Sequence, residues 1–190
     1  MKEIKAVIFD LDGTLVNLPI NWDEVREKVR KLLKTSHPLK PLGLSVYEIT
    51  RNNPELRERA FKLIESEELK AALQAKYDSR LHEMIVQLKK AGLKIGLVTL
   101  QGLKTAILVL EKLGIKNLFD VIVTRERSVY RLEQLKIALR ELKVKPEETI
   151  FVGDTIWDRE AGETLGCKIL IIGDTISNIL EVKGKIKKIS

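Results

Sequence analysis

The sequence holds little cysteine, few aromatic residues and no long apolar run. Cys167 is the only cysteine among 190 residues, which excludes an intrachain disulfide and disfavours a cysteine-based metal site. No segment reaches the roughly 20 apolar residues that a membrane-spanning helix needs. The chain begins with a strand-like segment and lacks the pattern of a signal peptide. We therefore expect a cytoplasmic protein with no membrane partner.

The positive charge is spread along the chain. The formal net charge is +7 and the pI is about 9.4, which fits nucleic acid or an acidic substrate. However, lysine and arginine alternate with glutamate on helical stretches such as 57–62, as on a solvated face. The one basic cluster, 183–188, has no aromatic residues on which bases could stack. The composition therefore does not favour nucleic acid as a partner.

The second half of the chain alternates between strand and helix patterns. We expect strands at 93–99, 119–124, 149–152 and 168–172, and helices at 104–113, 132–142 and 159–165. Such alternation predicts right-handed crossovers and a parallel sheet covered on both faces. The fold class is therefore α/β, with a Rossmann-like core of three layers.

The segment between the first strand and this core reads as helices only. Asn21 is placed to cap a helix over 22–33, and Asn53 with Pro54 begins another. A loop with two prolines precedes a short helix at 45–50, and a further helix or continuation runs from 69 towards 88. We expect a core of residues 1–17 and 80–190, with an all-helical insertion at 18–79.

The first acidic motif follows the opening strand. The apolar run 4–9 ends in Asp10-Leu11-Asp12-Gly13-Thr14. Residues i and i+2 of an extended segment point the same way, so Asp10 and Asp12 should project together from the carboxyl end of the strand. Two adjacent carboxylates need a cation or a shared proton. The alternative is a polar turn, in which Asp and Gly are common.

A second acidic motif follows the strand at 149–152. Asp154 and Asp158 are four residues apart at the start of a helix, so both carboxylates can face one side. Since parallel strands end at one edge of the sheet, Asp10, Asp12, Asp154 and Asp158 should converge. Carboxylates without cysteine or histidine suit Mg²⁺. The alternative is that Asp154 or Asp158 only caps the helix.

Thr99 ends the second predicted strand, ahead of Leu100 and Gln101. A hydroxyl and backbone N–H groups before a helix can bind phosphate. The alternative is that Thr99 serves as a helix cap.

With these residues assembled, the chain resembles the haloacid dehalogenase (HAD) superfamily, in its phosphoglycolate phosphatase-like branch. Asp10 to Thr14 resemble the family's first motif, Thr99 its second, and Gly153-Asp154 with Asp158 its fourth. The resemblance covers nearly the whole chain. It implies that the helical insertion is a cap of the C1 type.

The resemblance also implies a mechanism. Asp10 would attack phosphorus as the nucleophile, and Asp12 would act as general acid and then base. Mg²⁺ would be held by the Asp10 carboxylate, the Asp12 main-chain carbonyl and Asp154, with Asp158 close by.

The family's third motif is a lysine, usually followed by proline, and residues 124–134 contain no Lys-Pro. Arg131 is our first substitute and Arg127 the second, while Lys136 lies further along the helix. Arginine keeps the charge but differs in reach and geometry.

The function expected is hydrolysis of a small phosphorylated metabolite by a monomer or homodimer, with phosphoglycolate-type substrates as the default. The alternatives are a phosphomutase of the same superfamily and a non-catalytic protein that binds phosphate or nucleic acid. Dehalogenation is disfavoured, because the dehalogenases that the chain resembles lack the acid that Asp12 provides.

Overall fold

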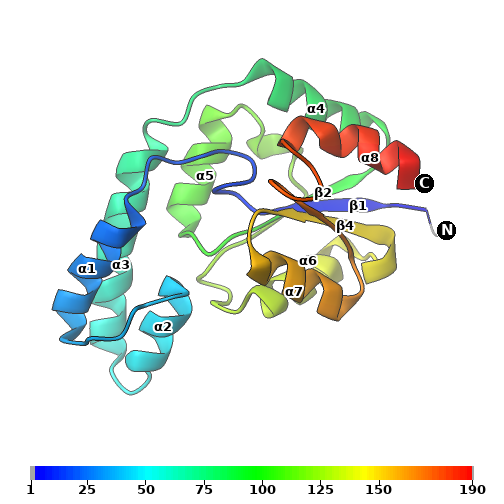
Figure 1. Ribbon diagram of the computed structural model, residues 1–190. Helices are drawn as coiled ribbons and strands as arrows, with labels where there is room; N and C mark the ends of the chain where they lie inside the picture. The colour runs from blue at the N-terminus through cyan, green and yellow to red at the C-terminus, as the bar shows by residue number, and fades with distance from the viewer. Residues whose placement is uncertain (1–2, 190) are drawn as a thin grey trace.

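A computed structural model describes residues 3–189 of the chain. Its centre is a parallel sheet with the strand order β3-β2-β1-β4-β5 (Figure 1). The strands are β1 (Ala6–Phe9), β2 (Lys94–Val98), β3 (Val121–Val123), β4 (Thr149–Gly153) and β5 (Lys168–Ile171). All residues of β1 are buried, as expected for a strand with neighbours on both sides and helices on both faces. The predicted α/β class is thereby confirmed.

Helices cover both faces of the sheet (Figure 1). Val7 and Phe9 of β1 face a cluster formed with α4 (Ser79–Lys90), α5 (Leu103–Lys112) and α8 (Val182–Ile189). Ala6 and Ile8 face the other cluster, which includes α6 (Arg131–Leu142) and α7 (Ile156–Leu165). The alternation of side chains along β1 therefore divides the core into two layers, one on each face.

A helical insert lies between β1 and β2. It contains α1 (Trp22–Leu33), α2 (Leu42–Ile49) and α3 (Pro54–Ala72), and we call it the cap. The Asn21 side chain accepts from Glu24 N at the start of α1, and the Asn53 side chain accepts from Leu56 N at the start of α3. The cap has its own apolar core, built from Val25, Val29, Leu33, Leu39, Val46, Ala60 and Ile64.

Helix α3 joins the cap to the sheet layers. Ala60 and Ile64 belong to the core of the cap, whereas Ala71 and Ala72 at the other end belong to the cluster on the sheet. The helix thus runs from the core of the cap into the core on the sheet. The domain boundaries expected at 17/18 and 79/80 stay a proposal.

Several boundaries differ from those expected. Helix α2 begins at Leu42, three residues early, and includes Gly43. The helix expected over 69–88 is two helices, because Asp78 caps a new one at Ser79. Helix α7 begins at Ile156, since Thr155 caps it.

Helix α8 was not expected at all. It carries the basic cluster, and the side chains of Lys187 and Lys188 lie outside the described part. Its first residue, Val182, is buried in the core next to α4. Residues 3–189 also contain three 3₁₀ turns, at Lys116–Leu118, Pro146–Glu148 and Ile179–Glu181. In the described part of the chain, none of the helices has the length and apolar character that crossing a bilayer requires.

Candidate active site

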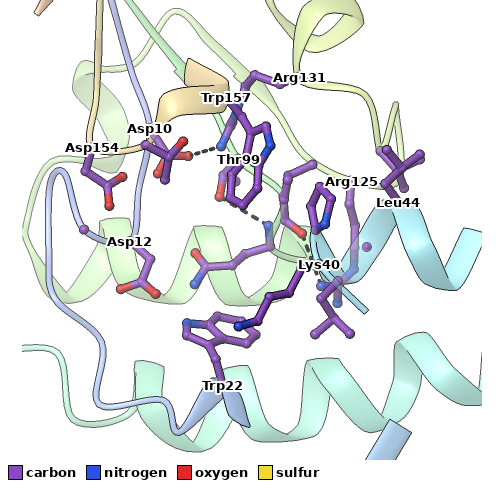
Figure 2. Close-up of a pocket in the computed structure, with 18 of the residues that line it drawn as sticks. Asp10, Asp12, Trp22, Lys40, Leu44, Thr99, Arg125, Arg131, Asp154 and Trp157 are labelled. Atoms are coloured by element: carbon purple, nitrogen blue, oxygen red, sulfur yellow. Dashed lines mark hydrogen bonds and ion pairs between the residues drawn. The ribbon is translucent and has the colours of Figure 1, made fainter. Parts of the chain in front are cut away.

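Three carboxylates meet at the carboxyl edge of the sheet. Asp10 follows β1, while Asp154 and Asp158 follow β4, the neighbouring strand. Each offers one oxygen such that the three oxygens lie within 4.8 Å of one another. Figure 2 shows Asp10 and Asp154 side by side at the edge of the cavity. The predicted convergence of the two acidic motifs is therefore present for these three residues.

The electrostatics of the cluster show how closely its charges are packed. The pKa of Asp10 is raised to about 8, chiefly by burial, with Arg131 lowering it and Asp158 and Asp154 adding to the rise. Burial likewise raises the pKa of Asp154 to about 6, with Asp158 adding to the effect. Three acids that all supply oxygen suit a hard divalent cation, which would relieve this repulsion. The residues present thus fit a divalent metal.

Glycine allows the two acidic motifs to approach one another. Gly13 has φ +86°, and a Cβ at this position would collide with the Asp154 carboxylate. A Cβ at Gly153 would likewise meet the Asp158 side chain, a contact within the second motif. The two motifs therefore interlock at Gly13, a position that only glycine can occupy without displacement.

The Asp12 carboxylate does not join the cluster. It accepts from Leu18 N at 2.8 Å, and the Trp22 side chain also donates to it. Figure 2 shows it turned towards Trp22 of the cap. The expectation that four carboxylates converge is corrected to three. The reason is that the chain turns at Leu11, whose carbonyl accepts from Leu15 N and Val16 N, so the rule for extended segments does not apply.

Asp158 both joins the cluster and caps a helix. Its Oδ2 accepts from the Thr155 hydroxyl at 2.6 Å and from Thr155 N at 3.1 Å, and Thr155 in turn accepts from Asp158 N. This is a capping box at the start of α7. The other oxygen, Oδ1, faces Arg131. Asp158 therefore caps α7, as the alternative held, and also belongs to the cluster of acids.

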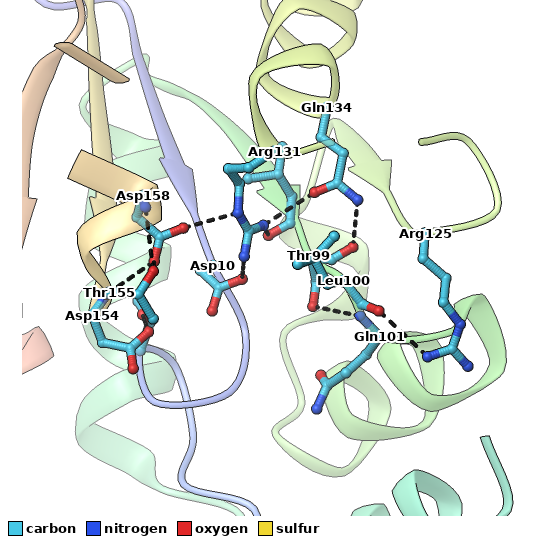
Figure 3. A network of polar contacts seen from close by, with 12 residues as sticks. Asp10, Thr99, Leu100, Gln101, Arg125, Arg131, Gln134, Asp154, Thr155 and Asp158 are labelled. Carbon is cyan, nitrogen blue, oxygen red and sulfur yellow. Dashed lines mark hydrogen bonds and ion pairs between the residues drawn. The ribbon is translucent and has the colours of Figure 1, made fainter. Parts of the chain in front are cut away.

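Arg131 reaches into the cluster from the start of α6. Its Nη2 lies 2.8 Å from Asp10 Oδ1, and its Nε lies 2.9 Å from Asp158 Oδ1 (Figure 3). Its Nη1 donates to Val98 O at 2.9 Å and to Gln134 Oε1, which fixes the guanidinium plane.

The two other cations considered for this role lie at the surface. Arg127 pairs with Glu141 and Lys136 pairs with Glu133, all of them exposed. Of the three, Arg131 is the residue that the structure brings to the acids.

The loop after Thr99 is arranged differently from the expected phosphate site. The N–H groups of Gln101, Gly102 and Leu103 already donate to Thr99 Oγ1, Glu68 Oε2 and Glu126 Oε1 respectively. Among the described residues, the Leu100 N–H has no such partner. Of the groups in this loop that we expected to bind phosphate, the Leu100 N–H and the Thr99 hydroxyl are therefore the ones that stay candidates, together with Arg131.

A cavity of about 890 Å³ opens from the acids towards the cap. Trp22 and Lys40 line it from the cap, and Gln101 and Trp157 line it from the core (Figure 2). A cavity of this size accommodates a whole small organic molecule and not only a phosphoryl group.

A buried ion pair joins the cap to the core beside this cavity. Glu68 of α3 lies 2.6 Å from Arg125 Nη1, and both side chains are almost fully buried. Glu68 also accepts from the Gly102 N–H. Sequence reasoning missed this pair. The one available signal was a charged residue on the apolar side of α3.

The sequence of the chain matches a known protein family. Residues 7–172 match the model of the haloacid dehalogenase-like hydrolase family. The chain belongs to this family. It is therefore a hydrolase of the phosphatase type, and the helical insert is a C1 cap.

Individual relatives agree with this assignment. The chain is 32% identical over 181 residues to the putative pyrophosphatase PpaX of Clostridium perfringens, covering 87% of this chain and 82% of that protein. The crystal structure of a β-phosphoglucomutase from Clostridium difficile has a TM-score of 0.70 at 18% identity, with 98% of each chain covered. A subfamily IA hydrolase of Geobacter sulfurreducens has a TM-score of 0.63 at 17% identity, with 96% of each covered. The two structures share the fold.

Proposed function

We propose that the protein is a Mg²⁺-dependent phosphatase that hydrolyses a small phosphorylated molecule through an aspartyl-phosphate on Asp10. The observation that carries the proposal is the Asp10 carboxylate, which contacts the Arg131 guanidinium and lies beside two further acids. Carboxylates can act as nucleophiles that form a phosphorylated intermediate. Asp10 lines the cavity through which a substrate would enter.

The reaction would run in two displacements. In the first, a carboxylate oxygen of Asp10 forms a bond to phosphorus while the bond from phosphorus to the ester oxygen breaks, and Asp12 gives its proton to that oxygen. In the second, Asp12 takes a proton from water, which attacks the same phosphorus and frees Asp10 and inorganic phosphate. Burial raises the pKa of Asp12, which favours the protonated form needed first.

Arg131 and the loop at Thr99 would bind the phosphoryl oxygens. The guanidinium carries a fixed charge and several N–H donors, so it can hold Asp10 and a phosphoryl oxygen together. This position supports Arg131 as the replacement for the missing lysine, and it weakens the case for a non-catalytic protein.

The metal would be held by the Asp10 carboxylate, the Asp12 main-chain carbonyl and Asp154, with Asp158 close by. When bound, Mg²⁺ would offset the negative charge of the transferring group. We further propose a monomer or homodimer of the cytoplasm.

The second candidate is hydrolysis of inorganic pyrophosphate. It is favoured by the 32% identical relative that is named a putative pyrophosphatase. A phosphomutase would use the same nucleophile, and the likeness to a β-phosphoglucomutase supports it only through the shared fold.

The experiment is release of inorganic phosphate from p-nitrophenyl phosphate, phosphoglycolate and pyrophosphate, with Mg²⁺ and after chelation. We expect turnover that chelation abolishes and that Asp10→Asn removes. Glucose 1-phosphate, with analysis for glucose 6-phosphate, distinguishes the mutase. Absence of metal-dependent turnover with every compound would contradict the proposal.

A further inference from the structure

Gln101 is a buried side chain whose amide group has no partner. The residue is 4% exposed, and neither Nε2 nor Oε1 has a hydrogen-bond partner among the described residues. Its backbone is fully engaged, because its N–H donates to Thr99 Oγ1 and its carbonyl accepts from Arg125 N. The loop is thus held in place by the main chain, and the side chain contributes nothing to that.

This arrangement is costly for the fold. An unpaired buried donor or acceptor destabilises a protein, whereas an apolar side chain of similar shape avoids the loss. In the described part of the chain, two other buried side-chain atoms lack a hydrogen bond, Arg26 Nε and Asp158 Oδ1. Arg26 pairs with Asp23 through Nη1, and Asp158 Oδ1 forms an ion pair with Arg131 Nε at 2.9 Å. Among the described residues, Gln101 is therefore the one whose entire buried side-chain polar group lacks a hydrogen-bond partner.

The amide faces the place where the leaving group of a substrate would lie. Gln101 lines the cavity together with Asp12, Trp22 and Lys40. Figure 3 shows its amide pointing away from Arg131, which would hold the phosphoryl group together with Asp10. Gln101 N also donates to Thr99 Oγ1, so the residue lies at the end of the cavity where the proposed phosphate site and the first atoms of the leaving group would be.

We propose that Gln101 recognises the leaving group of the substrate, and that the group it fits carries a hydroxyl close to the ester oxygen. A carboxamide presents one acceptor and two donors side by side, and a hydroxyl can pair with both kinds because it donates and accepts. The inference rests on the proposed function. It narrows the substrate class to hydroxylated organic phosphates.

The experiment compares two esters that differ only in their hydroxyls, glycerol 1-phosphate and n-propyl phosphate. We measure kcat/KM for both with wild-type protein, Gln101→Leu and the control Gln74→Leu, which changes an exposed glutamine outside the cavity. The wild type should prefer glycerol 1-phosphate, since a site built to bind a hydroxyl rejects the analogue that lacks it. In Gln101→Leu the preference should fall by on the order of tenfold or more, and in Gln74→Leu it should stay.

A thermal readout separates this role from a structural one. Gln101→Leu removes the unpaired amide, so its Tm should rise, whereas loss of a structural hydrogen bond would lower it. In the Asp10→Asn background, glycerol 1-phosphate should raise Tm more than n-propyl phosphate, and Gln101→Leu should remove the difference.

An equal preference in wild type and Gln101→Leu, or a lower Tm, would overturn the proposal. If no ester is turned over, the proposed function fails, and the binding comparison in the Asp10→Asn background still decides the role of Gln101.

Discussion

Arg131 Nη2 lies 2.8 Å from Asp10 Oδ1, although the two residues are 121 positions apart in the chain. The contact predicts that Arg131→Met lowers kcat/KM by on the order of 10²–10³, because a fixed charge beside the transferring group is lost. Arg131→Lys should retain part of the activity, since it restores the charge without the planar group. Steady-state kinetics with p-nitrophenyl phosphate measures both.

Arg127→Met is the matched control, because Arg127 pairs with Glu141 at the surface. Its kcat/KM should change little. A larger loss for Arg127→Met than for Arg131→Met would show that the wrong arginine has been chosen.

Gly13 keeps the space that the Asp154 carboxylate occupies. Gly13→Ala should reduce both stability and metal affinity, since it adds a Cβ that displaces Asp154 at a left-handed residue. The control is Gly166→Ala, which has nearly the same φ, +83°, but open space around it. Both variants bear a backbone strain of about 1 kcal/mol. In thermal unfolding with and without Mg²⁺, Gly13→Ala should lower Tm more than Gly166→Ala and should also reduce the rise in Tm that Mg²⁺ causes. Equal changes in the two variants would contradict the close approach of Gly13 and Asp154.

Removing one charge of the Glu68–Arg125 pair should destabilise the protein more than removing both. Glu68→Gln leaves the Arg125 guanidinium buried without its counter-charge, so it should cost about 3–5 kcal/mol of unfolding free energy. The double variant Glu68→Leu/Arg125→Met should be more stable than Glu68→Gln, because no charge remains to be desolvated. Denaturant unfolding measures this, with the exposed pair Glu58–Lys62 as control. A double variant less stable than Glu68→Gln would refute this view.

Cys167 should behave as an unreactive thiol. Burial raises its pKa to about 11, with a smaller contribution from Glu147. Only the thiolate reacts with iodoacetamide, so the rate of alkylation of the native protein should keep rising beyond pH 10. In denaturant the rate should level off near the ordinary thiol pKa of about 8.5. Matching profiles in the two states would contradict this burial.

Much of the fold could be predicted because its signals are local. Asn21 and Asn53 cap their helices with the hydrogen bonds expected of them. The alternation of strands and helices was sufficient for the parallel sheet, and the positions of the acids after β1 and β4 placed three carboxylates together.

What could not be predicted depends on contacts between distant segments. Helix α8 is held by the burial of Val182, which no local pattern indicates. The N–H groups of Gly102 and Leu103 are taken up by Glu68 and Glu126, which are tertiary pairings. The direction of Asp12 is set closer by, by Leu18 N and Trp22, through a turn that the spacing of residues along the chain does not encode.

The most direct test of the account is Mn²⁺ binding, followed by electron paramagnetic resonance, to wild type, Asp154→Asn and Asp12→Asn. We predict one bound ion per chain, an affinity at least about tenfold weaker in Asp154→Asn, and a much smaller change in Asp12→Asn, whose carboxylate lies outside the cluster. Binding that is absent in wild type, or weakened equally by both substitutions, would contradict the account.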